Sequence, residues 1–338
     1  MAESGDRRRF LHHSLLGAAG VAALSLEEKI LLAALQQEAE KKPSSPPQDE
    51  RPMPFGQIGN FKISRMLIGG NLIGGCAHSR DLLYVARLFK AYNTDEKVFE
   101  TLALCEAQGI NTVQLDPACI NVFHRYLTER GGKMQALLCV YPDADTGKVK
   151  SQLEFLLSKG ATFFYTHGGA TDQHMMNGRL DVVAKTVQAI KEMGVPAGVG
   201  SHALSVPVAC EKNDVGAEFY VKTLHSDKYW SATPENLRED FGWFKPRGDQ
   251  PFSFNDNMWC INPEETIEFM KSIRKPWFAF KVLAAGAIHP RIAFPYVLRN
   301  GADFVIVGMF DFQIAEDTAI FKEAYYKLGE KRDRPWCA

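Results

Sequence analysis

The chain has 338 residues, of which 46% are hydrophobic and 23% are charged, the composition of an ordinary globular protein. Its 39 basic and 40 acidic residues are mixed along the sequence and give a formal charge of −1, so no basic region indicates binding to nucleic acid or to an acidic membrane. The 7 cysteines include no Cys-x-x-Cys pair, and therefore indicate neither a disulfide framework nor a structural zinc site.

The first 25 residues combine a basic cluster with a short apolar run. Arg7-Arg8-Arg9-Phe10-Leu11 precedes residues 14–24, which are rich in Gly, Ala and Leu, and this order is typical of a secretory signal. The pattern resembles a twin-arginine export signal, in which two arginines and any residue precede Phe-Leu. The resemblance implies that the twin-arginine export machinery delivers the folded protein to the periplasm. The alternative is an amphipathic helix on a cytosolic protein; the run is too short for a stable membrane span.

A helix and a linker are predicted next. Leu31, Leu32 and Leu35 share one side of an amphipathic helix, which the proline- and serine-rich residues 43–47 end. We therefore divide the chain into a signal segment (1–25), a helix with its linker (26–52), a single folded domain (53–330) and a tail (331–338).

Short apolar runs alternate with helical patterns about eight times in the folded domain. The predicted strands are residues 64–70, 111–116, 135–141, 162–167, 196–202, 218–225, 277–285 and 303–309. The predicted helices are residues 95–108, 148–159, 180–193 and 291–299, with a last helix from about residue 315. Eight such units predict a (β/α)8 TIM barrel of the α/β class. The alternative, an open doubly wound sheet, calls for a G-x-G-x-x-G turn that residues 69–75 lack.

One connection, residues 226–262, is much longer than the others and is rich in aromatic residues. Long loops at the C-terminal face of a barrel either cover the site or form a subunit contact. We expect this loop to be a lid or the interface of a homo-oligomer.

Polar side chains stand where several predicted strands end, which is where barrel enzymes have their active sites. His167, His202 and His225 end three consecutive strands, and Asp116 ends the second. These four residues are predicted to bind one divalent metal ion, zinc, manganese or iron. Asp116 and His225 are also candidates for proton transfer. Alternatively, some of the histidines only bond to loops or bind substrate.

Lys281 is the candidate catalytic lysine. It shares strand parity with Ala279 and Leu283, whereas Phe278 and Phe280 are expected to pack outward on the helices. A lysine that points into the barrel either forms a Schiff base with a carbonyl substrate, neutralises an anion or pairs with a buried carboxylate.

Further residues near the predicted strand ends are candidates for substrate binding. They are Asn71, Lys222, Trp230 and Asp311, although the parity of Lys222 with Tyr220 and Leu224 favours the helix-facing side of its strand. Small residues at 283–287 and 307–309 leave room for a phosphate at main-chain N–H groups, or only for tight turns.

Residues 55–70 resemble the opening of aldo/keto reductases, where a hairpin precedes a Ser-Arg-hydrophobic-Gly strand, and residues 94–111 are similar to that family's first helix and second strand. The resemblance implies a barrel fold and a catalytic Asp, Tyr, Lys and His that work with NAD(P). Only His167 can be carried over. Gln114 falls nearest the Asp position, and residues 135–141 contain no Lys, so NAD(P) is not expected as a cofactor.

Three functions remain as hypotheses. The first is an exported lyase, isomerase or epimerase that acts, with help from a metal or a lysine, on a small carbonyl or sugar-derived substrate. The second is an oxidoreductase of the aldo/keto reductase type, and the third is a non-catalytic barrel that binds carbohydrate. A fold of this kind does not decide among them.

Overall fold

The computed structural model describes residues 49–338 except residues 79–81, 83, 243–257 and 330. The predicted signal segment and nearly all of the helix and linker lie outside the described residues. In the part of the chain that is described, no helix is long and apolar enough to cross a membrane.

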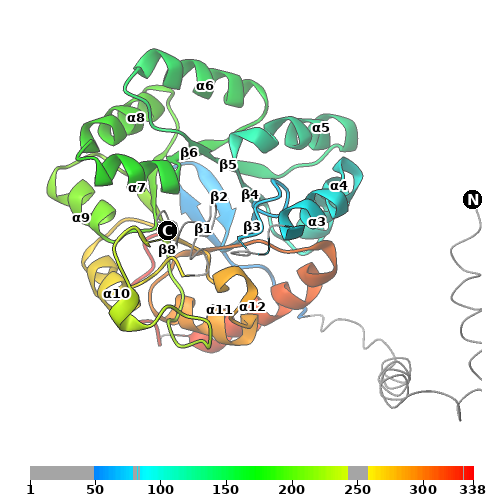
Figure 1. The fold of residues 1–338 in the computed structure, drawn as a ribbon. Helices are drawn as coiled ribbons and strands as arrows, with labels where there is room; N and C mark the ends of the chain where they lie inside the picture. Colours follow the sequence, from blue (N-terminus) through cyan, green and yellow to red (C-terminus); the bar gives the residue numbers. More distant parts are fainter. Residues whose placement is uncertain (1–48, 79–81, 83, 243–257, 330) are drawn as a thin grey trace, which may run out of the picture. The chain divides into compact units, whose positions relative to one another are not determined.

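Eight parallel strands close into a barrel in the order β10-β3-β4-β5-β6-β7-β8-β9, which confirms the predicted TIM barrel (Figure 1). The strands are β3 (Met66–Gly69), β4 (Thr112–Leu115), β5 (Gln135–Val140), β6 (Phe163–Thr166), β7 (Ala197–Ser201), β8 (Phe219–Thr223), β9 (Trp277–Phe280) and β10 (Phe304–Val307). The barrel closes where Val305 of β10 pairs with Met66 of β3.

Helices form a ring around the strands (Figure 1). They are α3 (Tyr84–Tyr92), α4 (Asp95–Ala107), α5 (Ile120–Arg130), α6 (Thr146–Ser158), α7 (Gly168–Met176), α8 (Leu180–Glu192), α9 (Ser205–Lys212), α10 (Pro263–Ser272), α11 (Pro290–Arg299) and α12 (Ile314–Leu328). Single-turn 3-10 helices are η2 (Pro117–Cys119), η3 (Glu235–Leu237), η5 (Ala284–Gly286) and η6 (Asp311–Gln313).

The boundaries of α4 illustrate how local sequence sets these elements. The side chain of Thr94 accepts the N–H of Lys97 at the helix start, and Asp95 and Glu96 place negative charge in the first turn, where the helix dipole favours it. The chain then turns at Gly109, whose φ of +84° lies in the left-handed region that favours glycine.

Large side chains from alternate strand positions fill the barrel interior. They form one buried cluster: Leu67, Leu137, Cys139, Phe163, Tyr165, Phe219, Val221, Phe278, Phe304 and Ile306. The prediction that Phe278 and Phe280 pack outward is therefore wrong, because Phe278 belongs to this cluster and Phe280 packs against it. Ala279 instead belongs to the buried cluster between the strands and the helices. Tyr220 of β8 and Leu224, which directly follows β8, belong to the same cluster.

The end of the barrel at which the strands begin is covered by a hairpin and by the C-terminal residues. Strands β1 (Phe55–Ile58) and β2 (Phe61–Ser64) pair antiparallel, and Ile58 and Ile63 join the interior cluster. Asp303, just before β10, is fully buried and accepts hydrogen bonds from Arg334 at 2.6 Å and Arg332 at 3.1 Å. Residues 331–338 thus pack against the start of β10.

Candidate active site

A cavity of about 360 Å³ opens at the C-terminal ends of the strands, a size that suits a small molecule. Five of the predicted site residues line it: Asn71, Asp116, His167, His202 and Lys281. They follow β3, β4, β6, β7 and β9, so the barrel topology alone brings them together.

His167 stands between β6 and α7 and acts as the N-cap of that helix. Its Nδ1 accepts the N–H of Ala170 at 3.1 Å, so in the neutral ring the proton is on Nε2. Burial lowers the pKa of His167, which favours this neutral form. The ring stacks on Tyr141 with centroids 4.5 Å apart. His167 therefore offers the cavity a hydrogen-bond donor.

His202 is paired with a buried carboxylate that the sequence analysis did not identify. Nδ1 of His202 lies 2.7 Å from Oδ2 of Asp172, and Asp172 also accepts the N–H groups of His202 and Ala203. Burial raises the pKa of Asp172 to about 8, against the opposing effect of these N–H groups, and burial also lowers the pKa of His202. The two groups share this hydrogen bond, so the protonation of one affects the protonation of the other.

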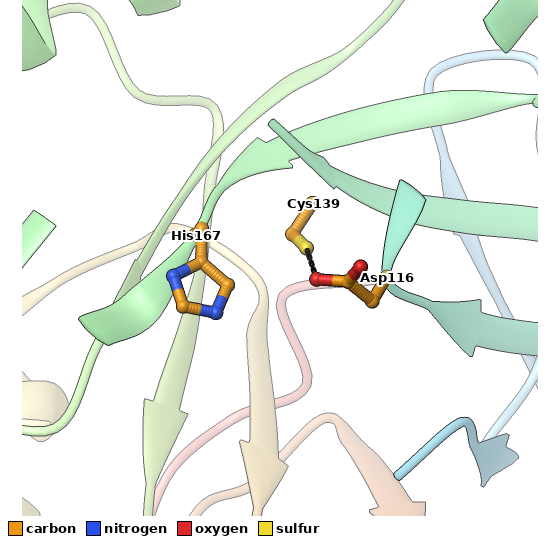
Figure 2. Close-up of side chains that lie close together, drawn as sticks. All are labelled: Asp116, Cys139 and His167. Carbon is orange, nitrogen blue, oxygen red and sulfur yellow. Dashed lines mark hydrogen bonds between the residues drawn. The ribbon is translucent and has the colours of Figure 1, made fainter. Parts of the chain in front are cut away.

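Asp116, Cys139 and His167 form a compact group on one wall of the cavity (Figure 2). One ligand-type atom of each lies within 4.8 Å of the others. Oδ2 of Asp116 accepts the hydroxyl of Tyr141 at 2.8 Å and lies 3.6 Å from Sγ of Cys139. Oδ1 accepts the N–H of Ala118 at 2.9 Å. The carboxylate is thereby held in one orientation toward the cavity.

This donor set does not fit a divalent ion as it stands. The lone pair of the His167 ring is used by Ala170, and burial raises the pKa of the Cys139 thiol well above its usual range. A divalent ion here would therefore have to displace the proton on Nε2 of His167 and the proton of the Cys139 thiol.

His225, the third predicted histidine ligand, does not line this cavity. Its Nδ1 donates to the carbonyl of Ser226 at 2.9 Å. Its Nε2 accepts the N–H groups of Trp259 at 3.1 Å and Cys260 at 3.0 Å. Both ring nitrogens are thus used by the main chain, and burial lowers the pKa of His225 to about 4. The structure does not bring His225 to the other predicted metal ligands; it anchors the end of the long loop instead.

Lys281 follows β9 directly and reaches the cavity through a left-handed turn, with φ of +58°, rather than through strand parity. Its Nζ donates to Nε2 of His78 at 2.9 Å and lies 4.4 Å from the centre of the Trp259 ring, contacts that favour the charged ammonium. A left-handed conformation costs a non-glycine residue about 1–2 kcal/mol, and strain of this kind is concentrated at functional sites.

The remaining predicted residues lie elsewhere. Lys222 is fully buried and does not line the cavity, whereas Trp230 is 90% exposed. Asp311 accepts hydrogen bonds from Tyr92 and Lys97. Reasoning from sequence missed Asp172, His78 and the role of Tyr141. Only Tyr141 had a signal, because it ends a predicted strand.

Fold and cavity together define a (β/α)8-barrel protein with a polar cavity at the C-terminal mouth of the barrel. The sequence matches no protein-family model and no curated protein. Among solved structures, the fold is similar to a candidate aldo-keto reductase from Pseudomonas aeruginosa, with a TM-score of 0.54 and 15% identity over 80% of this chain and 96% of that chain.

Two other solved structures are less similar to this chain. A phospho-2-dehydro-3-deoxyheptonate aldolase from Thermotoga maritima has a TM-score of 0.47 and 10% identity over 83% of this chain and 76% of that chain. An N-acetylneuraminate lyase from Fusobacterium nucleatum has a TM-score of 0.40 and 10% identity over 69% and 70% of the two chains. At 15% identity, the similarity to the aldo-keto reductase bears on the fold alone.

Proposed function

We propose that this protein is an enzyme that moves protons on a small hydroxylated carbonyl compound, as an isomerase, epimerase or lyase does. One observation carries the proposal: His202, paired with buried Asp172, lines the same cavity as a histidine fixed as a donor, His167. A histidine oriented by a carboxylate, beside donors whose orientation is fixed, is the arrangement that such proton transfer uses.

Each group has a role in this proposal. Nδ1 of His202 faces Asp172, so Nε2 is the nitrogen that takes a proton from the carbon next to the carbonyl group and returns it. The Nε2–H of His167 and the ammonium of Lys281 stabilise the negative oxygen that develops, because both are donors whose orientation is fixed in advance. Asp116 accepts a substrate hydroxyl.

The sequence predicts a divalent metal ion at this site, and the observed donor set argues against that prediction. Elemental analysis of the purified protein, before and after chelation, tests the alternative directly. We expect no zinc, manganese or iron at a ratio near one per chain, and no loss of proton-transfer activity on chelation. A bound ion that disappears in a His167→Ala variant would reverse this part of the proposal.

Hydrogen exchange tests the proposal itself without knowledge of the product. The full chain is incubated in D2O with a panel of small hydroxyaldehydes, hydroxyketones and 2-keto acids, and proton NMR follows the C–H signal next to the carbonyl group. We expect exchange with at least one class of compound, and its loss in His202→Ala. His124→Gln, outside the cavity, is the matched control. Absence of exchange across the panel, or full exchange in His202→Ala, would rule the proposal out.

Two alternatives have simple tests. Binding of NADPH with a quench of protein fluorescence would favour an oxidoreductase instead. Export is proposed from the Arg7-Arg8-Arg9-Phe10-Leu11 pattern and the apolar run that follows it. A reporter fused to the N-terminal segment is expected to reach the periplasm, and an Arg7→Lys, Arg8→Lys double variant to retain it in the cytoplasm.

A further inference from the structure

Lys222 of β8 is a fully buried lysine, and in the described parts of the chain no carboxylate lies within ion-pair distance of it. A buried charge without a counter-ion is costly, so its contacts need an explanation. Nζ donates to the carbonyl of Thr223 at 3.1 Å and to Oγ1 of Thr223 at 2.9 Å. Burial lowers the pKa of Lys222, while nearby Cys260 and Asp172 act in the opposite direction.

The hydroxyl of Thr223 connects two walls of the cavity. Its oxygen lies 3.2 Å from the carbonyl of His202 and 3.2 Å from the carbonyl of Trp259. An ammonium group can only donate, so Lys222 makes Thr223 Oγ1 an acceptor and directs its single proton toward these two carbonyls. His202 is held on the other side by Asp172, which accepts its main-chain N–H and shares a second hydrogen bond with its Nδ1.

We propose that Lys222 and Thr223 are positioning residues, which fix the His202 main chain so that its ring meets Asp172, and fix Trp259 beside Lys281. The relay runs from Lys222 through the Thr223 hydroxyl to both carbonyl groups. Lys222 never touches substrate, which agrees with its place on the helix-facing side of β8. The relevance of this relay to turnover rests on the proposed function, whereas its existence does not.

The proton shared by Nδ1 of His202 and Oδ2 of Asp172 gives a spectroscopic readout that needs no substrate. A proton in a buried bond to a carboxylate resonates far downfield, and its loss in His202→Ala assigns the signal in a sample with labelled histidine. Thr223→Val removes the hydroxyl at nearly constant shape, and Thr223→Ser keeps it. We expect the signal to shift or to vanish through solvent exchange in Thr223→Val and in Lys222→Met, and to persist in Thr223→Ser.

Thr186→Val is the matched control, because Thr186 is also buried and, among the described residues, its hydroxyl donates only to the carbonyl of Val182 within α8. If Thr223→Val leaves the His202 signal as unchanged as Thr186→Val does, the relay is wrong, whatever the two variants do to stability. If the signal responds but no compound in the panel exchanges, the relay stands and the proposed function fails. Where exchange is found, we expect Thr223→Val to slow it about tenfold to a hundredfold, and Thr223→Ser to restore most of the rate.

Discussion

Nζ of Lys281 lies 2.9 Å from Nε2 of His78, and both residues have left-handed main chains, with φ of +58° and +49°. Two strained residues from distant parts of the chain thus meet at the mouth of the barrel. Neither residue is part of the buried core, and strained residues of this kind are concentrated at functional sites.

Replacing Lys281 by Met is therefore expected to remove activity while the fold stays intact. The ammonium is the cationic donor of the cavity, and loss of one such donor slows reactions about a hundredfold to a thousandfold. Lys281→Arg keeps the charge and is expected to retain part of the rate. The measurement is hydrogen exchange alongside thermal unfolding, with the exposed Lys148→Met as control. Reduction with cyanoborohydride separates the roles: a substrate mass attached to Lys281 would mean an imine in place of an ammonium.

The pair of Asp172 and His202 predicts a pH dependence. The pKa of Asp172 is raised to about 8, so the form that accepts a proton accumulates as the pH rises through that value. The exchange rate is expected to increase with pH and to level off above about pH 8. Asp172→Asn presents an amide to Nδ1 and favours the wrong ring tautomer, with a loss of about a hundredfold or more. A rate that stays flat from pH 6 to pH 9 in the native protein would contradict this assignment.

The barrel was predictable because its signals are local. Residues 135–141 were predicted as a strand and Gln135–Val140 form β5, since an apolar run between helical patterns has few other ways to be buried. Lys281 shows the limit. The strand predicted at residues 277–285 ends at Phe280, where the left-handed Lys281 begins a turn. The left-handed residues of this turn include no glycine before Gly286, so the sequence gave no turn signal.

The partners of the histidines were beyond sequence reasoning for a different reason. Three histidines at strand ends look equivalent, yet each receives its role from groups that other elements bring to it. Ala170 in the first turn of α7 uses Nδ1 of His167, and Asp172 in the same helix orients His202. The main-chain N–H groups of Trp259 and Cys260, 34 and 35 residues further along the chain, donate to Nε2 of His225. Strand parity predicts the face of the sheet on which a side chain lies, but it does not predict which ring nitrogen of a histidine accepts a hydrogen bond.

Replacing His225 is expected to lower the stability of the fold, and not to remove a metal ligand. His225→Phe keeps a ring but leaves the N–H groups of Trp259 and Cys260 without their acceptor, which lowers the free energy of unfolding by about 3 kcal/mol at pH 7. The folded pKa of about 4 lies below the usual 6.5, so the unfolded chain binds the extra proton first and native stability falls as the pH drops between these values.

The difference between the native protein and His225→Phe is therefore expected to narrow toward pH 4. Urea unfolding at pH 7 and pH 4.5 measures both effects, with His124→Phe as the control. An unchanged difference at the two pH values would contradict a buried, neutral His225.

Asp317 of α12 predicts the opposite pH dependence. It is 5% exposed, its Oδ2 has no hydrogen-bond partner among the described residues, and burial raises its pKa from 3.8 to about 6. Because the folded state favours the protonated acid, stability falls as the pH rises from about 4 to about 6, and the cost persists above that range. A shift of this size corresponds to about 2–3 kcal/mol, reduced where the N-terminal end of α12 favours negative charge.

Asp317→Asn is neutral at every pH and nearly the same shape, so the expected gain is about 2 kcal/mol at pH 7.5 and none at pH 4. Glu316→Gln removes the same charge from the exposed neighbour and is expected to change stability by less than about 0.5 kcal/mol at either pH. Urea unfolding at the two pH values is the measurement. A loss of stability in Asp317→Asn at pH 7.5 would mean that the carboxylate is charged and stabilising in the folded protein, so that the helix end outweighs the burial.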